Sequence, residues 1–223
     1  SVTNPYKRGK LDYNVKLNIE NIVNVLKDVR DYVFPAKKIS NKFRSISSIQ
    51  QLESFIQERS AHVTQTTLYG YIKTRIGTRY AIMIEDEKFL ESINIAKWNI
   101  YIAALSDCTL YTFSFLTNKK NLKTNDSEKV FFSILDKEKK NGLDLKLYEN
   151  AKIQFVQRLK EVDWINYYHD KPFQRSGDAL YHWSPIADEL KKLDKEIVLN
   201  SISLKWNIVK NEFDDLTKDL KFN

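Results

Sequence analysis

The segment WNIYIAALSDCTLYTFSFL, residues 98–116, constrains the fold most, because its nineteen residues hold a single charge, that of Asp107. A membrane-spanning helix needs about 20 predominantly apolar residues, so the segment comes close in length. An acid at the midpoint opposes insertion by about 2.5–3.5 kcal/mol. Asn, Ser and Thr side chains add further polar groups, and the mean hydropathy of the chain is −0.49. These features favour a helix buried at the centre of a helical bundle over a membrane span.

A buried carboxylate needs a partner, because an isolated charge in an apolar interior is strongly unfavourable. We therefore expect Asp107 to form an ion pair with a buried arginine or to accept hydrogen bonds from hydroxyl groups. Arg75 and Arg79 are the nearest candidates along the chain. The prediction is a structural, buried polar group made of Asp107 with Arg75 or Arg79.

The shortage of turn-forming residues predicts the fold class. Gly and Pro together number nine in 223 residues, whereas sheet proteins use both residue types in their many turns. Hydrophobic residues at 42% and charged residues at 29% are typical of a globular chain. We predict an all-α protein, a single helical bundle of five to seven helices with a basic N-terminal extension.

Capping signals and apolar spacing predict where the helices begin and end. Predicted helices cover 48–76, 86–116, 127–140 and 144–160, and a last helix is expected to open at Ser184-Pro185 and reach Leu220. The predicted apolar stripe of that last helix consists of Ile186, Leu190, Leu193, Ile197, Leu204 and Ile208. The aromatic stretch 164–183 is expected to be an irregular connection.

The positive charge of the chain is concentrated near its start. Residues 1–45 hold ten Lys and Arg and four Asp and Glu, a net charge of +6, whereas the whole chain carries +7. We predict a boundary that separates an extension, 1–45, with one helix, from a helical domain, 46–223. Such an extension could bind nucleic acid, anionic lipid or an acidic protein face, or be a solvated arm. Its candidate binding residues are Lys7, Arg8, Lys10, Lys37, Lys38, Lys42 and Arg44.

No complete catalytic motif is found in the sequence. There is no G-x-S-x-G turn, no glycine-rich phosphate loop and no ligand spacing for zinc, so we predict no catalytic set, no metal and no cofactor. If the protein is an enzyme, the candidates are His169, Asp170 and His182, as a base with its orienting carboxylate. The alternative is that this aromatic-rich region pins a connection to the core. The tract TTLYGYIKTRIGTRYAIM interleaves basic and aromatic residues, which suggests either nucleic-acid contacts or an amphipathic helix.

Three spans resemble a family of small alphaproteobacterial proteins whose members often carry an automatic "esterase" label. The spans are FIQERSAHVTQTTLYGYIKTRIGTRY, SINIAKWNIYIAALSDCTLYT and GDALYHWSPIADELKKLDKEIVLNSISLKW, and the resemblance covers about residues 46–215. It implies a bacterial or bacterium-derived organellar origin, and hence a bacterial cytoplasm or the mitochondrial matrix as the compartment. It supplies no agreed catalytic residues.

We predict a non-catalytic helical interaction protein, a subunit or assembly factor docked on a larger complex. It is expected not to be an integral membrane protein, although peripheral association is compatible with the basic extension. The alternatives from other classes are an esterase-type hydrolase and an RNA-binding protein that uses the basic arm.

Overall fold

The computed structural model describes residues 43–83 and 85–222, and this part of the chain is all-α. It contains seven α-helices and no strand, which confirms the all-α part of the predicted fold class. The helices are α2 (Ile49–Ile76), α3 (Tyr80–Met83), α4 (Glu87–Lys120), α5 (Ser127–Lys140), α6 (Leu145–Glu161), α7 (Gln174–Trp183) and α8 (Asp188–Leu216), with a 3₁₀ turn, η3 (Gly77–Arg79), between α2 and α3. The predicted basic extension and its helix lie outside the described residues, apart from 43–45.

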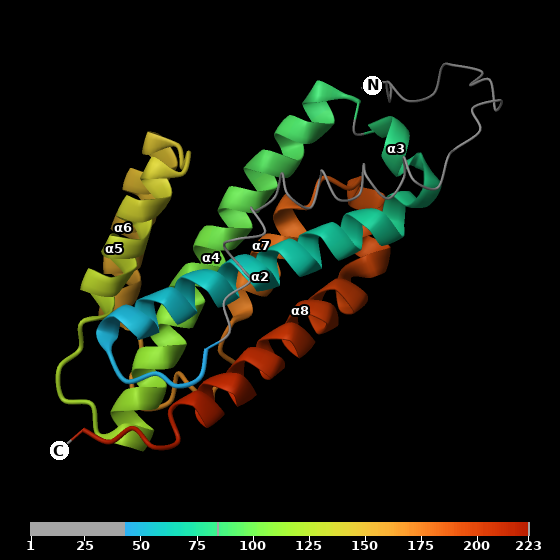
Figure 1. Ribbon diagram of the computed structural model, residues 1–223. Coiled ribbons are helices and arrows are strands. Elements are labelled where there is room, and N and C mark those ends of the chain that lie inside the picture. The colour runs from blue at the N-terminus through green and yellow to red at the C-terminus, as the bar shows by residue number, and fades with distance from the viewer. Residues whose placement is uncertain (1–42, 84, 223) are drawn as a thin grey trace, which may run out of the picture.

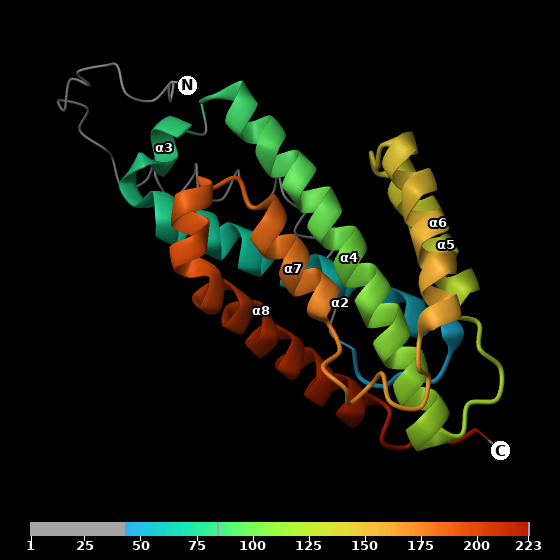
Figure 2. The same ribbon diagram turned by 180° about the vertical axis from the view of Figure 1, so that it is seen from behind.

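Helix α4 is the centre of the molecule. It packs against α2, α5 and α7, while α8 closes the bundle by packing against both α2 and α7. The hairpin of α5 and α6 stands beside α4 on the side away from α8, as both views show (Figures 1 and 2). The described helices therefore form a four-helix bundle and a hairpin that covers a further face of α4, with one continuous core.

The apolar segment in α4 is a core helix. Helix α4 is long and apolar enough to cross a membrane by length and composition, but 78% of its most apolar window is buried against other helices. The side chains of Ile100, Tyr101 and Phe113 are inaccessible to solvent. The structure does not indicate an integral membrane protein, and the bundle itself supplies the apolar surroundings that the segment requires.

Local capping interactions set the ends of several helices where the sequence predicts them. The Ser48 side chain accepts a hydrogen bond from the Gln51 N–H, 3.1 Å away, at the start of α2. Asp86 and Asp144 do the same for α4 and α6. Gly142, at φ 104°, forms the turn between α5 and α6, a backbone conformation that glycine adopts without strain.

Loss of the first cap should lower stability by a modest amount. Ser48→Ala removes the acceptor that satisfies the Gln51 N–H, so we expect the free energy of unfolding to fall by about 0.5–2 kcal/mol. Urea denaturation monitored by circular dichroism measures the change. Ser203→Ala, at an exposed position within α8, is the control and should not lower the unfolding midpoint, because Ala favours the helix at least as much as Ser does. Equal midpoints for both variants would mean that the cap contributes nothing.

The end of the chain differs from the prediction in two ways. Residues 174–183 form the helix α7 instead of an irregular connection, and α8 starts at Asp188 instead of Ser184. The Ser184 hydroxyl donates to the Leu180 carbonyl oxygen at 2.6 Å, so it terminates α7 and does not cap α8. Helix α7 fits closely on α8 because Gly177 has no side chain: a Cβ there would lie 3.4 Å from Leu199.

The face of α8 that packs on the bundle is not the predicted stripe. Its buried residues are Lys191, Val198, Ile202, Trp206, Val209, Phe213 and Leu216. Trp206 stacks on Phe173, with ring centroids 4.0 Å apart, and its indole N–H donates to the Ser176 hydroxyl. These contacts anchor α8 to the start of α7.

The first described residues pack on the end of the bundle. The Phe43 ring lies 5.5 Å from the Phe55 ring, and the Ile46 N–H donates to the Leu216 carbonyl oxygen at 3.0 Å. The bundle therefore includes Phe43 and Ile46, close to the predicted boundary between extension and domain.

Candidate functional site

Asp107 lies at the centre of a buried polar cluster. Its side chain has no solvent exposure, and one carboxylate oxygen, Oδ1, is 2.6 Å from the Arg158 guanidinium of α6. The other oxygen, Oδ2, accepts a hydrogen bond from the Ser176 N–H at 2.8 Å. The Arg158 guanidinium also donates to the hydroxyls of Ser106, at 2.8 Å, and Tyr167, at 3.0 Å. A buried ion pair with further hydrogen bonds of this kind is how an interior accommodates a charge.

The partner of Asp107 is Arg158 rather than Arg75 or Arg79, for a geometric reason. Cys108, the neighbour of Asp107, interacts with Ser60 of α2. Arg75 lies fifteen residues further along the same helix, which is a distance of about 22 Å. It pairs instead with Asp194 of α8, at 2.9 Å, and Arg79 is exposed in the 3₁₀ turn.

The Asp107 carboxylate also supports the start of α7. The residue that precedes this helix, Phe173, has no side-chain acceptor and adopts a left-handed backbone conformation, with φ 74°. The carboxylate of Asp107 takes the place of the missing cap by accepting from Ser176 in the first turn. The cluster therefore ties α4, α6 and α7 together, which is a structural role.

The structure separates the two candidate histidines. His169 precedes α7 and His182 lies in its last turn, so most of the helix, a rise of about 12 Å from Gln174 to His182, lies between them. Both side chains are exposed, as is that of Asp170. His169 stands edge-on to Tyr168, and His182 is edge-on to Trp183. The three residues do not meet in one site.

The Cys108 thiol is also buried in the core. Burial raises the pKa of the Cys108 thiol to about 12, so the thiolate form that acts as a nucleophile is suppressed. Among residues 43–83 and 85–222, no group of three or more His, Cys, Asp or Glu side chains could hold a metal ion.

The basic and aromatic tract is partly used for packing. Tyr71 donates to Asp194 at 2.8 Å and Arg75 pairs with the same carboxylate, whereas Lys73 and Arg79 are exposed. Of the predicted arm residues, Arg44 is described and exposed. The other arm residues are outside the described part of the chain; they are Lys7, Arg8, Lys10, Lys37, Lys38 and Lys42.

The candidate interaction site is the outward face of α8. Five large aliphatic side chains recur there at helical spacing, which puts them in one row along the helix; they are Leu190, Leu193, Ile197, Leu204 and Ile208, here called the α8 row. Four of them are largely exposed, at 76% for Leu193, 72% for Ile197, 65% for Leu204 and 62% for Ile208.

The α8 row matches most of the stripe that the sequence pattern predicts for the last helix, but it faces the opposite way. A second row, which includes Val198, Ile202 and Trp206, faces the core. Hydrophobic spacing alone does not distinguish two apolar rows on one helix, because both have the helical period. The signal that sequence reasoning missed is the second row. Toward the end of α8 this row continues with apolar residues up to Leu216, whereas the α8 row ends at Ile208.

No family model, no curated protein and no solved structure matches this chain.

Proposed function

We propose that this protein is a non-catalytic interaction protein, a subunit or assembly factor that docks on a larger complex through the α8 row. The observation that carries the proposal is the exposure of this row of large aliphatic side chains on a helix whose opposite face is buried in the bundle. Soluble proteins rarely leave a large continuous apolar patch open to water unless it is an interaction surface.

The energetics favour a docked state. Burying an exposed Leu or Ile side chain contributes about 1.5–3 kcal/mol, so several such residues outweigh much of the entropy lost on association. Exposed polar residues border the row on one side, among them Glu189, Glu196 and Asn200. An apolar centre with a polar rim is typical of protein interfaces. The partner surface that fits is an amphipathic helix with an apolar stripe.

We also propose a reducing compartment for this protein. The resemblance to the alphaproteobacterial family implies a bacterial or organellar origin. The lone cysteine, Cys108, is buried and forms no disulfide. Both fit a reducing setting, the bacterial cytoplasm or the mitochondrial matrix.

A triple substitution in the α8 row tests the proposal. We expect Leu193→Glu, Ile197→Glu and Leu204→Glu together to abolish co-purification of the partner when the protein is isolated from its native cells. The melting temperature should stay the same, because the three side chains are exposed in the isolated protein. Quantitative mass spectrometry of the purified material, with calorimetry of the protein alone, provides both readouts.

A charge-matched control separates a lost surface from added charge. Lys192→Glu with Ser203→Glu changes the net charge by the same −3 on the exposed polar side of α8 and should retain the partner. Retention of the partner by the triple variant would show that docking uses another surface. If no protein co-purifies with the wild type, the interaction function is wrong.

The two alternative functions predict different results. An esterase-type hydrolase would turn over short acyl esters, and His169→Ala or His182→Ala would abolish this activity. RNA binding through the basic arm would show an affinity that falls steeply with salt concentration.

A further inference from the structure

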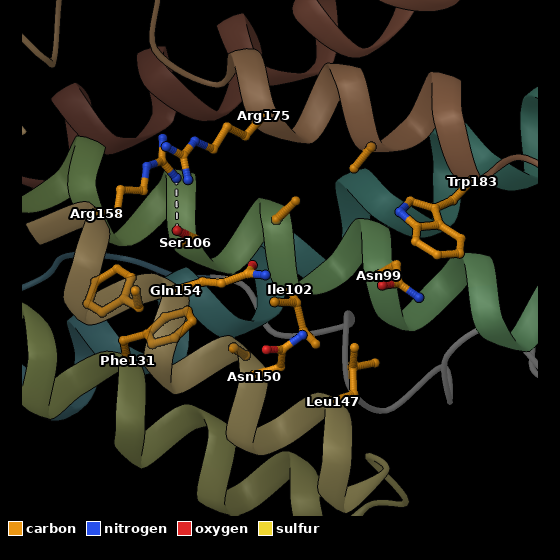
Figure 3. Close-up of a pocket in the computed structure, with 14 residues that line it drawn as sticks. Asn99, Ile102, Ser106, Phe131, Leu147, Asn150, Gln154, Arg158, Arg175 and Trp183 are labelled. Carbon is orange, nitrogen blue, oxygen red and sulfur yellow. Dashed lines mark hydrogen bonds between the residues drawn. The ribbon is translucent and has the colours of Figure 1, made fainter. Parts of the chain in front are cut away.

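A cleft between α4, α6 and α7 is a second candidate site, separate from the α8 row. Its volume is about 260 Å³. This volume equals that of about nine water molecules in the liquid, so it suits a ligand of about ten non-hydrogen atoms. The cleft is open to solvent on one side and reaches the buried cluster around Arg158 (Figure 3).

The charge of the cleft has one sign. Among its fourteen described lining residues, the charged ones are Arg158 and Arg175, and none is acidic. Asp107 does not line the cleft, but it pairs with Arg158 and neutralises the charge of its guanidinium. Arg175 is exposed and has no ion-pair partner within residues 43–83 and 85–222. One positive charge therefore remains uncompensated at the end of the cleft that Arg158 and Ser106 line (Figure 3).

The two arginines and the indole of the cleft lie at different ends. Figure 3 shows Arg158, Arg175 and Ser106 at one end, and Trp183 with Asn99 at the other. The other lining residues include the apolar side chains of Ile102, Phe131 and Phe155 and the amides of Asn150 and Gln154. Phe131 and Phe155 are stacked, with ring centroids 4.0 Å apart.

We propose that this cleft binds a small organic anion, with a carboxylate or phosphate group at Arg175 and Ser106 and an apolar ring or chain directed toward Trp183. A guanidinium forms two parallel hydrogen bonds with either anion, which is the reason that both head groups fit. Arg158 acts as a positioning residue: its bond to Ser106 orients the hydroxyl. The indole of Trp183 offers an apolar face for the body of the ligand.

Titration of the full chain with four small probes tests the site. The probes are benzoate, phenyl phosphate, inorganic phosphate and benzylamine, followed through the indole N–H signal of Trp183, assigned with Trp183→Phe. We expect saturable binding of benzoate or phenyl phosphate, and whichever binds identifies the head group. Inorganic phosphate, which lacks the ring, should bind at least about tenfold more weakly, and benzylamine, with the same ring and the opposite charge, should not bind.

Two arginine variants complete the test. Arg175→Gln should weaken binding of the anionic aromatic probe by at least about tenfold, since a hydrogen bond to a charged group is lost. Arg79→Gln removes the same charge from an exposed position on η3 and should leave the affinity unchanged. The proposal is overturned if neither aromatic anion binds, if benzylamine binds as well as they do, or if the two variants bind equally.

Discussion

Replacing Arg158 with Met should be among the most destabilising single changes in this protein. The substitution leaves the fully buried Asp107 carboxylate without its ion-pair partner. Removing one member of a buried pair lowers the free energy of unfolding by about 3–5 kcal/mol, because an uncompensated charge remains in the interior. We expect chemical denaturation of Arg158→Met to show a loss of this size.

A second substitution at the partner position separates the charge effect from a packing effect. Asp107→Asn in the Arg158→Met background removes the orphaned charge and keeps an oxygen that can accept from the Ser176 N–H. The double variant should therefore recover more than half of the loss. If the double variant is no more stable than Arg158→Met, the cost comes from lost packing of Arg158 and the electrostatic account fails.

Trp206→Ala should have an effect of similar size for a different reason. The indole is 2% exposed, stacks on Phe173 and donates to the Ser176 hydroxyl at 2.9 Å. Deleting a buried Trp side chain leaves a cavity and lowers the free energy of unfolding by about 3–5 kcal/mol.

Comparison with Trp206→Phe separates the contribution of the indole hydrogen bond from that of the ring stack. Phe keeps a stacking ring but loses the indole N–H and part of the buried ring, so its cost should lie between that of one hydrogen bond, about 0.5–1.5 kcal/mol, and that of Trp206→Ala. Both variants are measured by urea denaturation. A loss of less than about 1 kcal/mol for Trp206→Ala would mean that α8 is not anchored to α7 at this point.

The local ends of the helices were predictable because their causes lie within a few residues. Ser48 caps α2, Asp86 caps α4, and the turn at Asn141-Gly142 separates α5 from α6. Each of these signals acts between neighbours in the chain, through one hydrogen bond or one backbone conformation. The exception is Ser184, which has the sequence context of a helix start but donates to the Leu180 carbonyl at the end of α7.

Helix α7 was missed because the interactions that stabilise it come from far along the chain. Its first turn is capped by Asp107 of α4, and its Gly177 permits close approach to α8. A ten-residue segment with a glycine near its middle has little intrinsic helical stability, so tertiary packing decides its conformation. The candidate cleft depends on the same helix, since α7 provides both Arg175 and Trp183.

The sequence by itself determined the all-α class, most helix ends and the core position of the segment around Asp107. Scarce Gly and Pro, local caps and one long apolar run are properties of the chain read in order. Only the tertiary structure decided that Arg158 pairs with Asp107 and that the α8 row faces outward. A charge pair depends on which helices cross at the same level, and burial depends on which of two equally periodic rows meets the neighbouring helices. Neither the ion-pair partner of a residue nor the buried face of a helix is encoded in the spacing of residues along that helix.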